Sequence, residues 1–251
     1  MKKILIIGDT CLDRFVYCHA HRLAPDLPVP VLKIIEEVEN PGMAKNVGRN
    51  VRAIYKNCTL ITNKEWRKIT KTRYVHQDSN HTFIRVDTEP PIKRVNVRSI
   101  PLKDYDIVGI SDYDKGFLTK EDITYLCKHH TCVFVDTKKL LGPWIANAKY
   151  IKINNVEYER SRHTISSTLA KKIIHTKGSS GAEFQGKTYP IEKVEVKDLT
   201  GAGDSFFAAL LVRYAETGDI AEAIRFANEC AREVVQHRGV TLIQRPQSIM
   251  R

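Results

Sequence analysis

The sequence has no apolar run approaching the ~20 residues that a membrane-spanning helix needs. Its first apolar run, residues 4–7, follows two lysines but is broken at once by Gly8 and Asp9. That run is too short for the apolar segment of a signal peptide, so we interpret it as a buried first strand. These absences predict a cytoplasmic protein without a membrane partner.

The sequence also lacks any C-x-x-C pair, although it contains six cysteines. This excludes zinc ribbons and thioredoxin-like redox motifs, and it favours reduced thiols. Metal-capable side chains gather at Cys127, His129, His130 and Cys132, but no second group of ligands accompanies them. We therefore interpret these four as core and surface positions rather than as a metal site.

Acidic residues are too few to balance the basic ones, and the formal net charge is +11. Such an excess can attract nucleic acids, acidic surfaces or phosphorylated small molecules. The basic residues are scattered, and no basic helix or nucleic-acid motif collects them. We expect no nucleic-acid partner and favour a solvated basic surface around an anion site. A basic nucleic-acid binder is the alternative, and salt-dependent retention of DNA or RNA would reveal it.

No internal repeat, low-complexity tract or clear linker divides the chain, which predicts a single domain over residues 1–251 with a small β protrusion. Short buried strands alternate with helical patterns, as in a three-layer α/β/α fold with a mainly parallel sheet. Helices are predicted at 44–55, 203–217 and 219–236, and buried strands at 4–7, 107–110, 132–135 and 150–153.

Prolines around residues 29–38 predict an edge or protruding strand there. Two further strands, 70–76 and 82–87, flank the turn QDSN and predict a hairpin. In open parallel sheets, ligands bind beyond the carboxyl ends of the strands. Polar residues follow the predicted strands at Asp9, Asp112, Asp136, Asn154 and Thr176.

The stretch LTGAGDSFFAALL, residues 199–211, joins a glycine-rich turn to a helical apolar pattern. Gly201 and Gly203 allow a close backbone approach, and the helix N-terminus favours an anion such as phosphate. Asp204 would repel that phosphate, but it suits a base that takes a proton from an attacking alcohol. The turn is neither a Walker A loop nor a G-x-G-x-x-G motif. A tight loop followed by an ordinary acid in the first helical turn is the alternative.

Three segments together resemble the ribokinase-like (PfkB) carbohydrate kinases. DLTGAGD resembles their D-x-T-G-A-G-D signature, NNVE at 154–157 their N-x-x-E motif, and TKGSSG at 176–181 their T-x-G-x-x-G segment, all in the family's order. Residues 1–51 are similar to the heptose 7-phosphate kinases, through IIGDTCLDRFVY, RLAPDLPVPVLKI and ENPGMAKNV. FIRVDTE, SDYDKG and VDTKK extend this likeness along the chain.

The resemblance implies a ribokinase-like α/β/α fold with a β lid, at about 22–41 and 70–89, that covers the sugar and often pairs subunits into a homodimer. It also implies ATP- and Mg²⁺-dependent phosphoryl transfer to a sugar or sugar phosphate. The preferred acceptor is heptose 7-phosphate, giving heptose 1,7-bisphosphate, a precursor of lipopolysaccharide.

By the same resemblance, Asp204 is the catalytic base, and Gly201, Ala202 and Gly203 form the anion hole. Asn154 and Glu157 would act through magnesium and its waters. The ATP site would further include Lys177, Ser179, Gly181 and Thr200. Sugar contacts fall on Asp13, Gly42 and Asn46, and candidates for the acceptor's phosphate are Arg14, Lys115 and Lys138.

Several alternatives stay open. Asp13 also suits a loop acid, Asn154 a strand terminator, and Lys115 and Lys138 solvated lysines. Met43 and Lys45 depart from the family pattern beside the sugar. The stretches after residue 55 and from 159 to 173 are shorter than in the family. These departures leave room for another sugar or nucleoside acceptor, or for a degenerate protein that binds a nucleotide or sugar phosphate without turnover.

Overall fold

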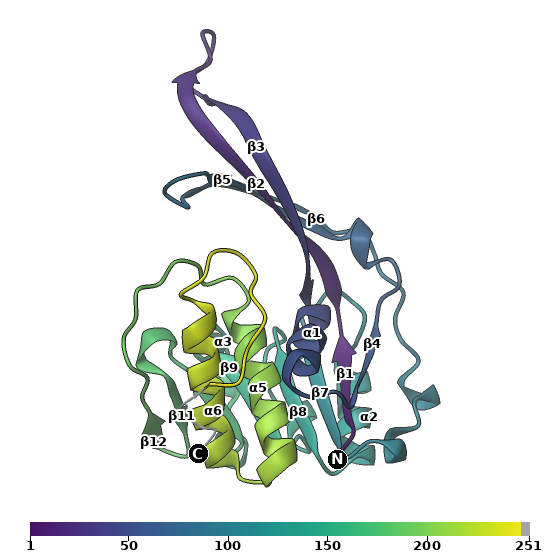
Figure 1. The fold of residues 1–251 in the computed structure, drawn as a ribbon. Coiled ribbons are helices and arrows are strands. Elements are labelled where there is room, and N and C mark those ends of the chain that lie inside the picture. The colour runs from purple at the N-terminus through teal and green to yellow at the C-terminus, as the bar shows by residue number, and fades with distance from the viewer. Residues whose placement is uncertain (247–251) are drawn as a thin grey trace.

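The computed structural model describes residues 1–246 and contains a central eight-stranded sheet (Figure 1). Its strand order is β12-β11-β10-β9-β8-β7-β1-β4, and the six strands from β10 to β4 run parallel. The antiparallel hairpin β11–β12 forms one edge. The strands are β1 (Ile4–Gly8), β4 (Cys58–Thr62), β7 (Ile107–Asp112), β8 (Val133–Thr137), β9 (Tyr150–Asn154), β10 (Ile173–Thr176), β11 (Ala182–Phe184) and β12 (Lys187–Tyr189).

Helices cover both faces of this sheet, because its parallel strands are apolar on both sides. In β1, Ile4 and Ile6 pack toward one helical layer, whereas Leu5 and Ile7 pack toward the other, and all four are fully buried. The first layer contains α1 (Ala44–Ile54), α5 (Ala202–Thr217) and α6 (Ile220–Val234), and the second contains α2 (Lys120–His129), α3 (Asn155–Ser161) and α4 (Ser167–Ala170). The three-layer α/β/α arrangement predicted from the sequence is therefore confirmed.

Local sequence signals set the ends of these helices. Thr119 caps α2 and Asn154 caps α3, each in a reciprocal capping box with the acid three residues later. Helix α5 is buried on nearly all sides and ends at Gly218, which adopts a left-handed conformation. Between α3 and β10 the chain forms only short helical segments, in agreement with the predicted shortening.

A second, four-stranded sheet rises from the body as a long projection, which we call the lid (Figure 1). Its order is β3-β2-β5-β6, with bounds β2 (Thr10–Leu23), β3 (Pro30–Met43), β5 (Thr70–His76) and β6 (Thr82–Thr88). Strand β2 begins one residue after β1, and β3 runs directly into α1. The lid is thus continuous with the central sheet at Asp9 and with α1 at Met43.

The sequence interpretation located β3 and the β5–β6 hairpin of the lid, but it missed the full extent of β2 and all of β4. The first lid strand starts at Thr10, well before the expected residue 22, because the mixed polarity of β2 hides its strand pattern. The second missed strand is β4, which pairs with β1 at the sheet edge and is only half-buried. Within residues 1–246, no helix combines the length and the apolar character that membrane crossing requires.

Candidate active site

A pocket of about 270 Å³ lies between the base of the lid and the start of α5. The lid and its junction with α1 contribute four of its residues, and the rest come from the loop after β7 and from the turn that opens α5. The lining residues are Asp13, Met43, Lys71, Arg73, Tyr113, Leu199, Thr200, Gly201 and Asp204. The pocket therefore joins charged lid residues to the GAGD turn that the sequence singled out.

Asp204 lies in the first turn of α5 and is only 5% exposed, yet it lines this pocket. Asn46 donates a hydrogen bond to its Oδ2 (2.9 Å), and the Tyr113 hydroxyl donates one to its Oδ1 (2.7 Å). Burial raises the pKa of Asp204 to about 6, although both hydrogen bonds oppose this shift. A carboxyl group with such a pKa is poised to accept a proton near neutral pH.

Asp9 holds the loop that carries Tyr113, one of the two residues that orient Asp204. The backbone N–H groups of Tyr113 and Phe117 donate to the buried carboxylate of Asp9, at 2.7 and 3.2 Å, which fixes the loop after β7. Burial and the neighbouring Asp112 raise the pKa of Asp9 to about 6. Asn46 and Tyr113 thus act as positioning residues for Asp204.

A chain of amides supports Asn46 from the other side. Asn50 donates its side-chain N–H to the carbonyl oxygen of Asn46 (2.9 Å) and to its Oδ1 (3.1 Å). The Oδ1 of Asn50 in turn accepts from the backbone N–H of Ile243 (2.9 Å). Asn46, expected as a sugar contact, therefore points its amide at Asp204 and does not line the pocket.

The glycine turn leaves a backbone donor free beside the acid. Gly201 has φ 82°, a left-handed conformation that favours glycine, and it caps α5 without a side chain. Asp198 holds the preceding chain by accepting from the N–H of Thr200 (2.8 Å). The N–H of Ala202 donates to the carbonyl oxygen of Leu199 (3.2 Å), whereas the N–H of Gly203, in the first turn of α5, has no backbone acceptor among the described residues. Gly203 therefore lies where an anion would be stabilised.

A buried lysine lies behind this turn. Lys152, within β9, is 3% exposed, and its Nζ donates to Asp136 (2.8 Å). A Cβ atom added at Gly203 would lie 3.2 Å from that Nζ. The ammonium group therefore approaches the glycine turn from inside the sheet and adds positive charge to the anion site.

Asn154 and Glu157 lie at the end of β9 and the start of α3, where they cap the helix together. Glu157 accepts from the backbone of Asn154 (2.9 Å) and also forms an ion pair with Lys138. Burial works against the charge of Lys138, but Asp136 and Glu157 raise its pKa overall. Lys138 is therefore no solvated lysine, and Asn154 is at least a helix cap.

This group of residues fits a hydrated Mg²⁺. The Oδ1 of Asp136 is buried without a hydrogen-bond partner among the described residues, and Asp136 and Glu157 both lie against Lys138. Carboxylate oxygens are the ligands that Mg²⁺ prefers, usually together with several waters. Glu157 and Asp136 are thus the residues that would hold the ion.

The expected nucleotide loop, 176–181, follows β10 and is largely exposed. It closes on itself through a hydrogen bond from the N–H of Lys177 to the carbonyl oxygen of Gly181 (2.7 Å), and Lys177 pairs with Glu183. Ser179 lies in its short helical turn. Because β10 is next to β9, this loop lies at the same sheet edge as Asn154.

On the lid side, Asp13 lines the pocket and is 8% exposed. It accepts from Arg73 of β5 (2.9 Å), so the lid strands β2 and β5 are tied together at the pocket wall. Gly42 lies directly against Asp13, because an added Cβ would come within 2.1 Å of its Oδ2. Asp13 is therefore a well-packed pocket acid and not a loop acid.

Two expected phosphate contacts do not reach the pocket. Arg14 follows Asp13 in β2, so its side chain emerges from the opposite face of the strand and pairs with Glu39 (2.6 Å). Lys115 pairs with Glu89 at the end of the lid. Neither is among the pocket-lining residues. Lys45, suspected beside the sugar, instead stacks on Trp66, with its Nζ 4.0 Å from the ring centroid.

Sequence reasoning missed five residues of this site. Lys71 and Arg73 belong to a hairpin whose pairing with β2 no local pattern announces, and Lys152 lies inside an otherwise apolar strand. The SDYDKG segment could have indicated Tyr113. Asp136 had been noted only as a polar residue that follows a predicted strand. Among residues 1–246, the side chains of Cys127, His129, His130 and Cys132 do not come together as a group of possible metal ligands.

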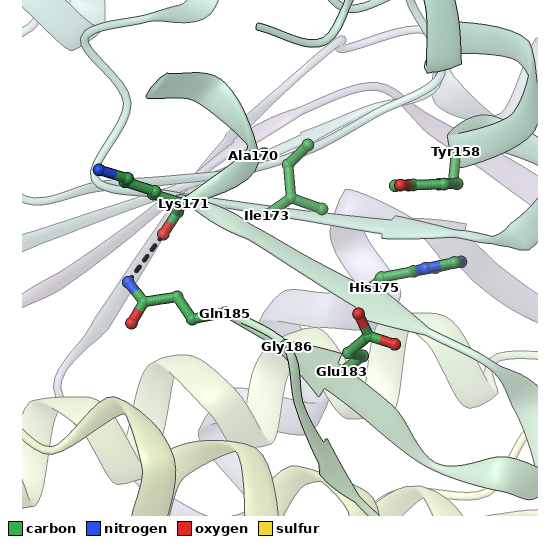
Figure 2. A pocket seen from close by; sticks show the side chains of 8 residues that line it. All are labelled: Tyr158, Ala170, Lys171, Ile173, His175, Glu183, Gln185 and Gly186. Carbon is green, nitrogen blue, oxygen red and sulfur yellow. Dashed lines mark hydrogen bonds between the residues drawn. The ribbon is translucent and has the colours of Figure 1, made fainter. Parts of the chain in front are cut away.

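A larger hollow of about 500 Å³ lies elsewhere, beside α3, α4 and the β11–β12 hairpin (Figure 2). It is lined by residues such as Tyr158, His175 and Gln185, and the Tyr158 and His175 rings stack with centroids 4.3 Å apart. Burial lowers the pKa of His175. The glycine of this hollow, Gly186, lies in a hairpin turn and not at the start of a helix, and its acid, Glu183, is paired with Lys177, so we assign the chemistry to the smaller pocket.

Met43 occupies a position that favours glycine. It has φ 57° and ψ −135°, which costs a residue with a side chain about 1–3 kcal/mol. Both Met43→Gly and Met43→Ala lose the buried side chain, but only alanine keeps the backbone strain. We therefore expect Met43→Gly to be more stable than Met43→Ala by about 1–3 kcal/mol. Urea unfolding of both variants measures this difference. An alanine variant as stable as the glycine variant would contradict the backbone argument.

Comparisons with known proteins find relatives of this chain in sequence and in fold. The sequence profile of the pfkB family carbohydrate kinases matches residues 121–247. The bifunctional protein HldE of Helicobacter pylori (strain Shi470) is 30% identical over 301 aligned positions, which take in 96% of this chain and 64% of that protein. HldE of a Nitratiruptor species is also 30% identical, over 94% of this chain and 62% of that protein. The chain thus spans just under two thirds of the length of these relatives.

Solved structures share the fold at low sequence identity. A ribokinase from Thermotoga maritima superposes with a TM-score of 0.74 at 18% identity, covering 96% of this chain and 95% of that one. A nucleoside kinase of the ribokinase family from Methanocaldococcus jannaschii gives a TM-score of 0.72 at 19% identity, covering 96% and 93%. These two likenesses establish the ribokinase-like fold that the sequence motifs predicted.

Proposed function

Because this chain belongs to the pfkB family of carbohydrate kinases, we propose that it transfers the γ-phosphoryl group of ATP to a hydroxyl of a phosphorylated sugar. The observation that carries the proposal is the buried carboxyl group of Asp204. Asn46 and Tyr113 hold it against a pocket, next to a glycine turn in which the N–H of Gly203 has no backbone acceptor among the described residues. Such a pairing suits an alcohol that attacks a phosphoryl group.

In the proposed reaction, Asp204 accepts the proton of the acceptor hydroxyl as its oxygen bonds to the γ-phosphorus. The bond from that phosphorus to the bridging oxygen breaks, and ADP leaves. The N–H groups at Gly201, Ala202 and Gly203 donate to the transferring phosphoryl oxygens. No covalent enzyme intermediate is needed, so positioning and charge stabilisation account for the rate.

The remaining site residues would hold the donor. Lys177, Ser179 and Gly181 line the proposed nucleotide loop, and Thr200 leads into the anion hole. Asn154, Glu157 and Asp136 would hold Mg²⁺, partly through its waters, and the bound ion would neutralise charge on the phosphates. Lys138 and Lys152 provide positive charge on the protein side of the same region.

We infer that the acceptor carries a phosphate, and heptose 7-phosphate is our preferred candidate. The similarity of residues 1–51 to heptose 7-phosphate kinases supports this choice, as do the two cationic side chains in the pocket. Arg73 is engaged with Asp13, whereas Lys71 lines the pocket without an ion pair among the described residues. Lys71 therefore replaces Arg14 and Lys115 as the proposed phosphate contact, and Asp13 would accept from sugar hydroxyls.

We expect Lys71→Ala to raise the KM for heptose 7-phosphate roughly ten- to hundredfold, because a hydrogen bond to a charged group contributes about 1.5–3 kcal/mol. The assay is a panel of phosphorylated and neutral sugars with ATP consumption as the readout. Lys33→Ala, an exposed lysine on the same lid, is the matched control and should leave KM unchanged. Turnover of neutral sugars alone would contradict a phosphorylated acceptor, and equal KM values in both variants would contradict Lys71 as its phosphate contact.

A different acceptor within the same fold is the second candidate, because Met43 fills part of the pocket at a position where the similar kinases have glycine. The same panel, extended to ribose, fructose phosphates and nucleosides, distinguishes the two. Binding of ATP without turnover of any panel member would instead favour a degenerate binding protein.

We also propose that the lid pairs two subunits in a homodimer. Seven large apolar side chains of the lid are about half exposed, which is a common mark of an interface: Leu23, Leu27, Val29, Ile34, Ile35, Ile84 and Val86. The mass in solution, measured by light scattering, tests this pairing. The use of ATP and the six free cysteines favour a cytoplasmic location.

A further inference from the structure

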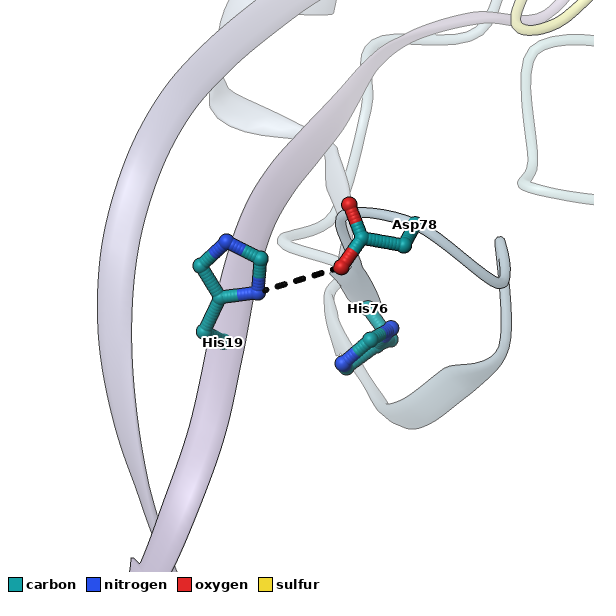
Figure 3. Close-up of side chains that lie close together, drawn as sticks. All are labelled: His19, His76 and Asp78. Atoms are coloured by element: carbon teal, nitrogen blue, oxygen red, sulfur yellow. Dashed lines mark ion pairs between the residues drawn. The ribbon is translucent and has the colours of Figure 1, made fainter.

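Two histidines and an aspartate meet on the lid, away from the proposed active site (Figure 3). His19 comes from β2, His76 from the end of β5, and Asp78 from the turn that joins β5 to β6. One ligand atom from each of the three lies within 4.8 Å of the others. The chain thus brings together donors from two hairpins that are far apart in the sequence.

From this geometry we propose that His19, His76 and Asp78 form a binding site for a divalent transition-metal ion, with Zn²⁺ as the best match. Two imidazoles and a carboxylate are a donor set that zinc commonly takes. Tetrahedral zinc with bonds of about 2.0–2.1 Å separates its ligand atoms by roughly 3.4 Å. Asp78 is 74% exposed at the turn, so its side chain can move the short distance required.

The state of His19 supports this assignment. Its Nδ1 is buried and has no hydrogen-bond partner among residues 1–246, a cost that native proteins usually avoid. The nearest carboxylate oxygen, Oδ2 of Asp78, is 3.7 Å away, too far for a hydrogen bond. A metal ion between them would satisfy both atoms.

The surroundings hold the other ligands in place. The Oγ of Ser79 lies 3.1 Å from Nδ1 of His76, and the backbone N–H of Ser79 donates to the same atom (3.3 Å), so Ser79 fixes the orientation of that ring. For Nε2 to bind a metal, Nδ1 would have to carry the proton and donate it to the Ser79 Oγ. His21 stacks on His19 with centroids 5.0 Å apart, so a further imidazole lies close by. Cys18 is adjacent, but its thiol donates to the carbonyl oxygen of Val75, so we do not count it among the ligands.

A metal at this site would clamp the turn 76–81 onto β2. The same turn already reaches the body of the protein, because Asn80 donates to the carbonyl oxygen of Lys197 (2.8 Å) just ahead of the glycine turn. Bound metal would therefore stiffen the lid on the side that faces the pocket. This role is independent of the proposed kinase reaction.

The test uses the full chain without an affinity tag and titrates it with Zn²⁺ by calorimetry and with Co²⁺ by absorption spectroscopy. We expect one tight equivalent, a rise in the thermal midpoint with Zn²⁺, and a loss of affinity of at least about tenfold in His19→Ala and His76→Ala. Asp78→Asn, at an exposed turn, tests the site with little risk to folding. His81→Ala, in the same turn but outside the cluster, is the matched control and should bind as the parent does.

Circular dichroism of each variant shows that a lost equivalent reflects lost ligands and not unfolding. The assignment is overturned if the chain binds no zinc at micromolar concentrations, or if the tight equivalent survives all three substitutions. Thiolate-to-cobalt charge-transfer bands would also overturn it, since they would show that cysteines bind the metal.

Discussion

Asp204→Asn folds but loses about 10²–10⁴-fold of its turnover, the contribution expected of a positioned general base. Asparagine has nearly the same size and can still accept a hydrogen bond from Tyr113, so the first turn of α5 stays intact. It cannot accept the proton of the attacking hydroxyl. The measurement is kcat with saturating ATP and the best acceptor of the panel, together with a thermal unfolding curve.

The pH dependence offers a second measure of the same residue. Since the carboxylate is the active form and burial raises the pKa of Asp204 to about 6, kcat/KM falls as the pH drops through that value. The contribution of Asp204 to the free energy of unfolding changes with pH in the opposite direction to that of an ordinary salt-bridged acid. The folded state holds the proton more tightly than the unfolded state, so Asp204 lowers stability as pH rises from about 4 to about 6. The asparagine variant should lack this component and be at least as stable at neutral pH.

Asp219→Asn is the matched control for that experiment. Asp219 is an exposed cap of α6 whose Oδ1 accepts from two backbone N–H groups, and asparagine caps helices equally well. It should keep full activity and the wild-type pH profile. Near-normal turnover in Asp204→Asn would refute the assignment of the base, whatever its effect on stability.

Lys152→Met is expected to destabilise the fold by about 3–5 kcal/mol, the usual cost of removing one partner of a buried ion pair. The loss leaves the carboxylate of Asp136 buried with only Lys138, 4.0 Å away, to compensate it. The same change removes positive charge from behind Gly203, so kcat should fall even at temperatures where the variant is folded. Urea unfolding and steady-state kinetics measure the two effects separately.

A double substitution tests the physical cause. In Lys152→Met with Asp136→Asn, no uncompensated charge remains, and a large part of the lost stability should return while activity stays low. Lys56→Met, an exposed lysine, controls for the substitution itself and should change stability by less than about 0.5 kcal/mol. Equal destabilisation of the single and double variants would show that Lys152 acts through packing and not through its charge.

The sequence predicted the parts of this molecule that depend on local signals. Short apolar runs located four of the parallel strands, and polar residues after them marked the edge where the pocket lies. Glycines and an acid at 201–204 indicated the start of α5. Each of these features depends on residues within a few positions of one another.

Features that depend on pairing between distant strands could not be predicted from such local signals. Arg14 was expected beside Asp13, but successive residues in a strand point to opposite faces, and β2 had not been recognised as a strand. Lys71 and Arg73 reach the pocket only because β5 pairs in parallel with β2. The same pairing brings His76 toward His19. Register, which sets every one of these contacts, has no signature in any single segment.

The contact between Asn50 and Ile243 has a consequence for biosynthesis. The two residues are 193 positions apart, and Asn46 and Asp204 are 158 apart. A ribosome must therefore have made residues 1–204 before the base can meet Asn46, and must reach Ile243 before that residue can bond to Asn50. A nascent chain halted between Tyr189 and Ile243 would have all the strands of the sheet but a loosely oriented base, so catalytic competence should follow the completion of the sheet.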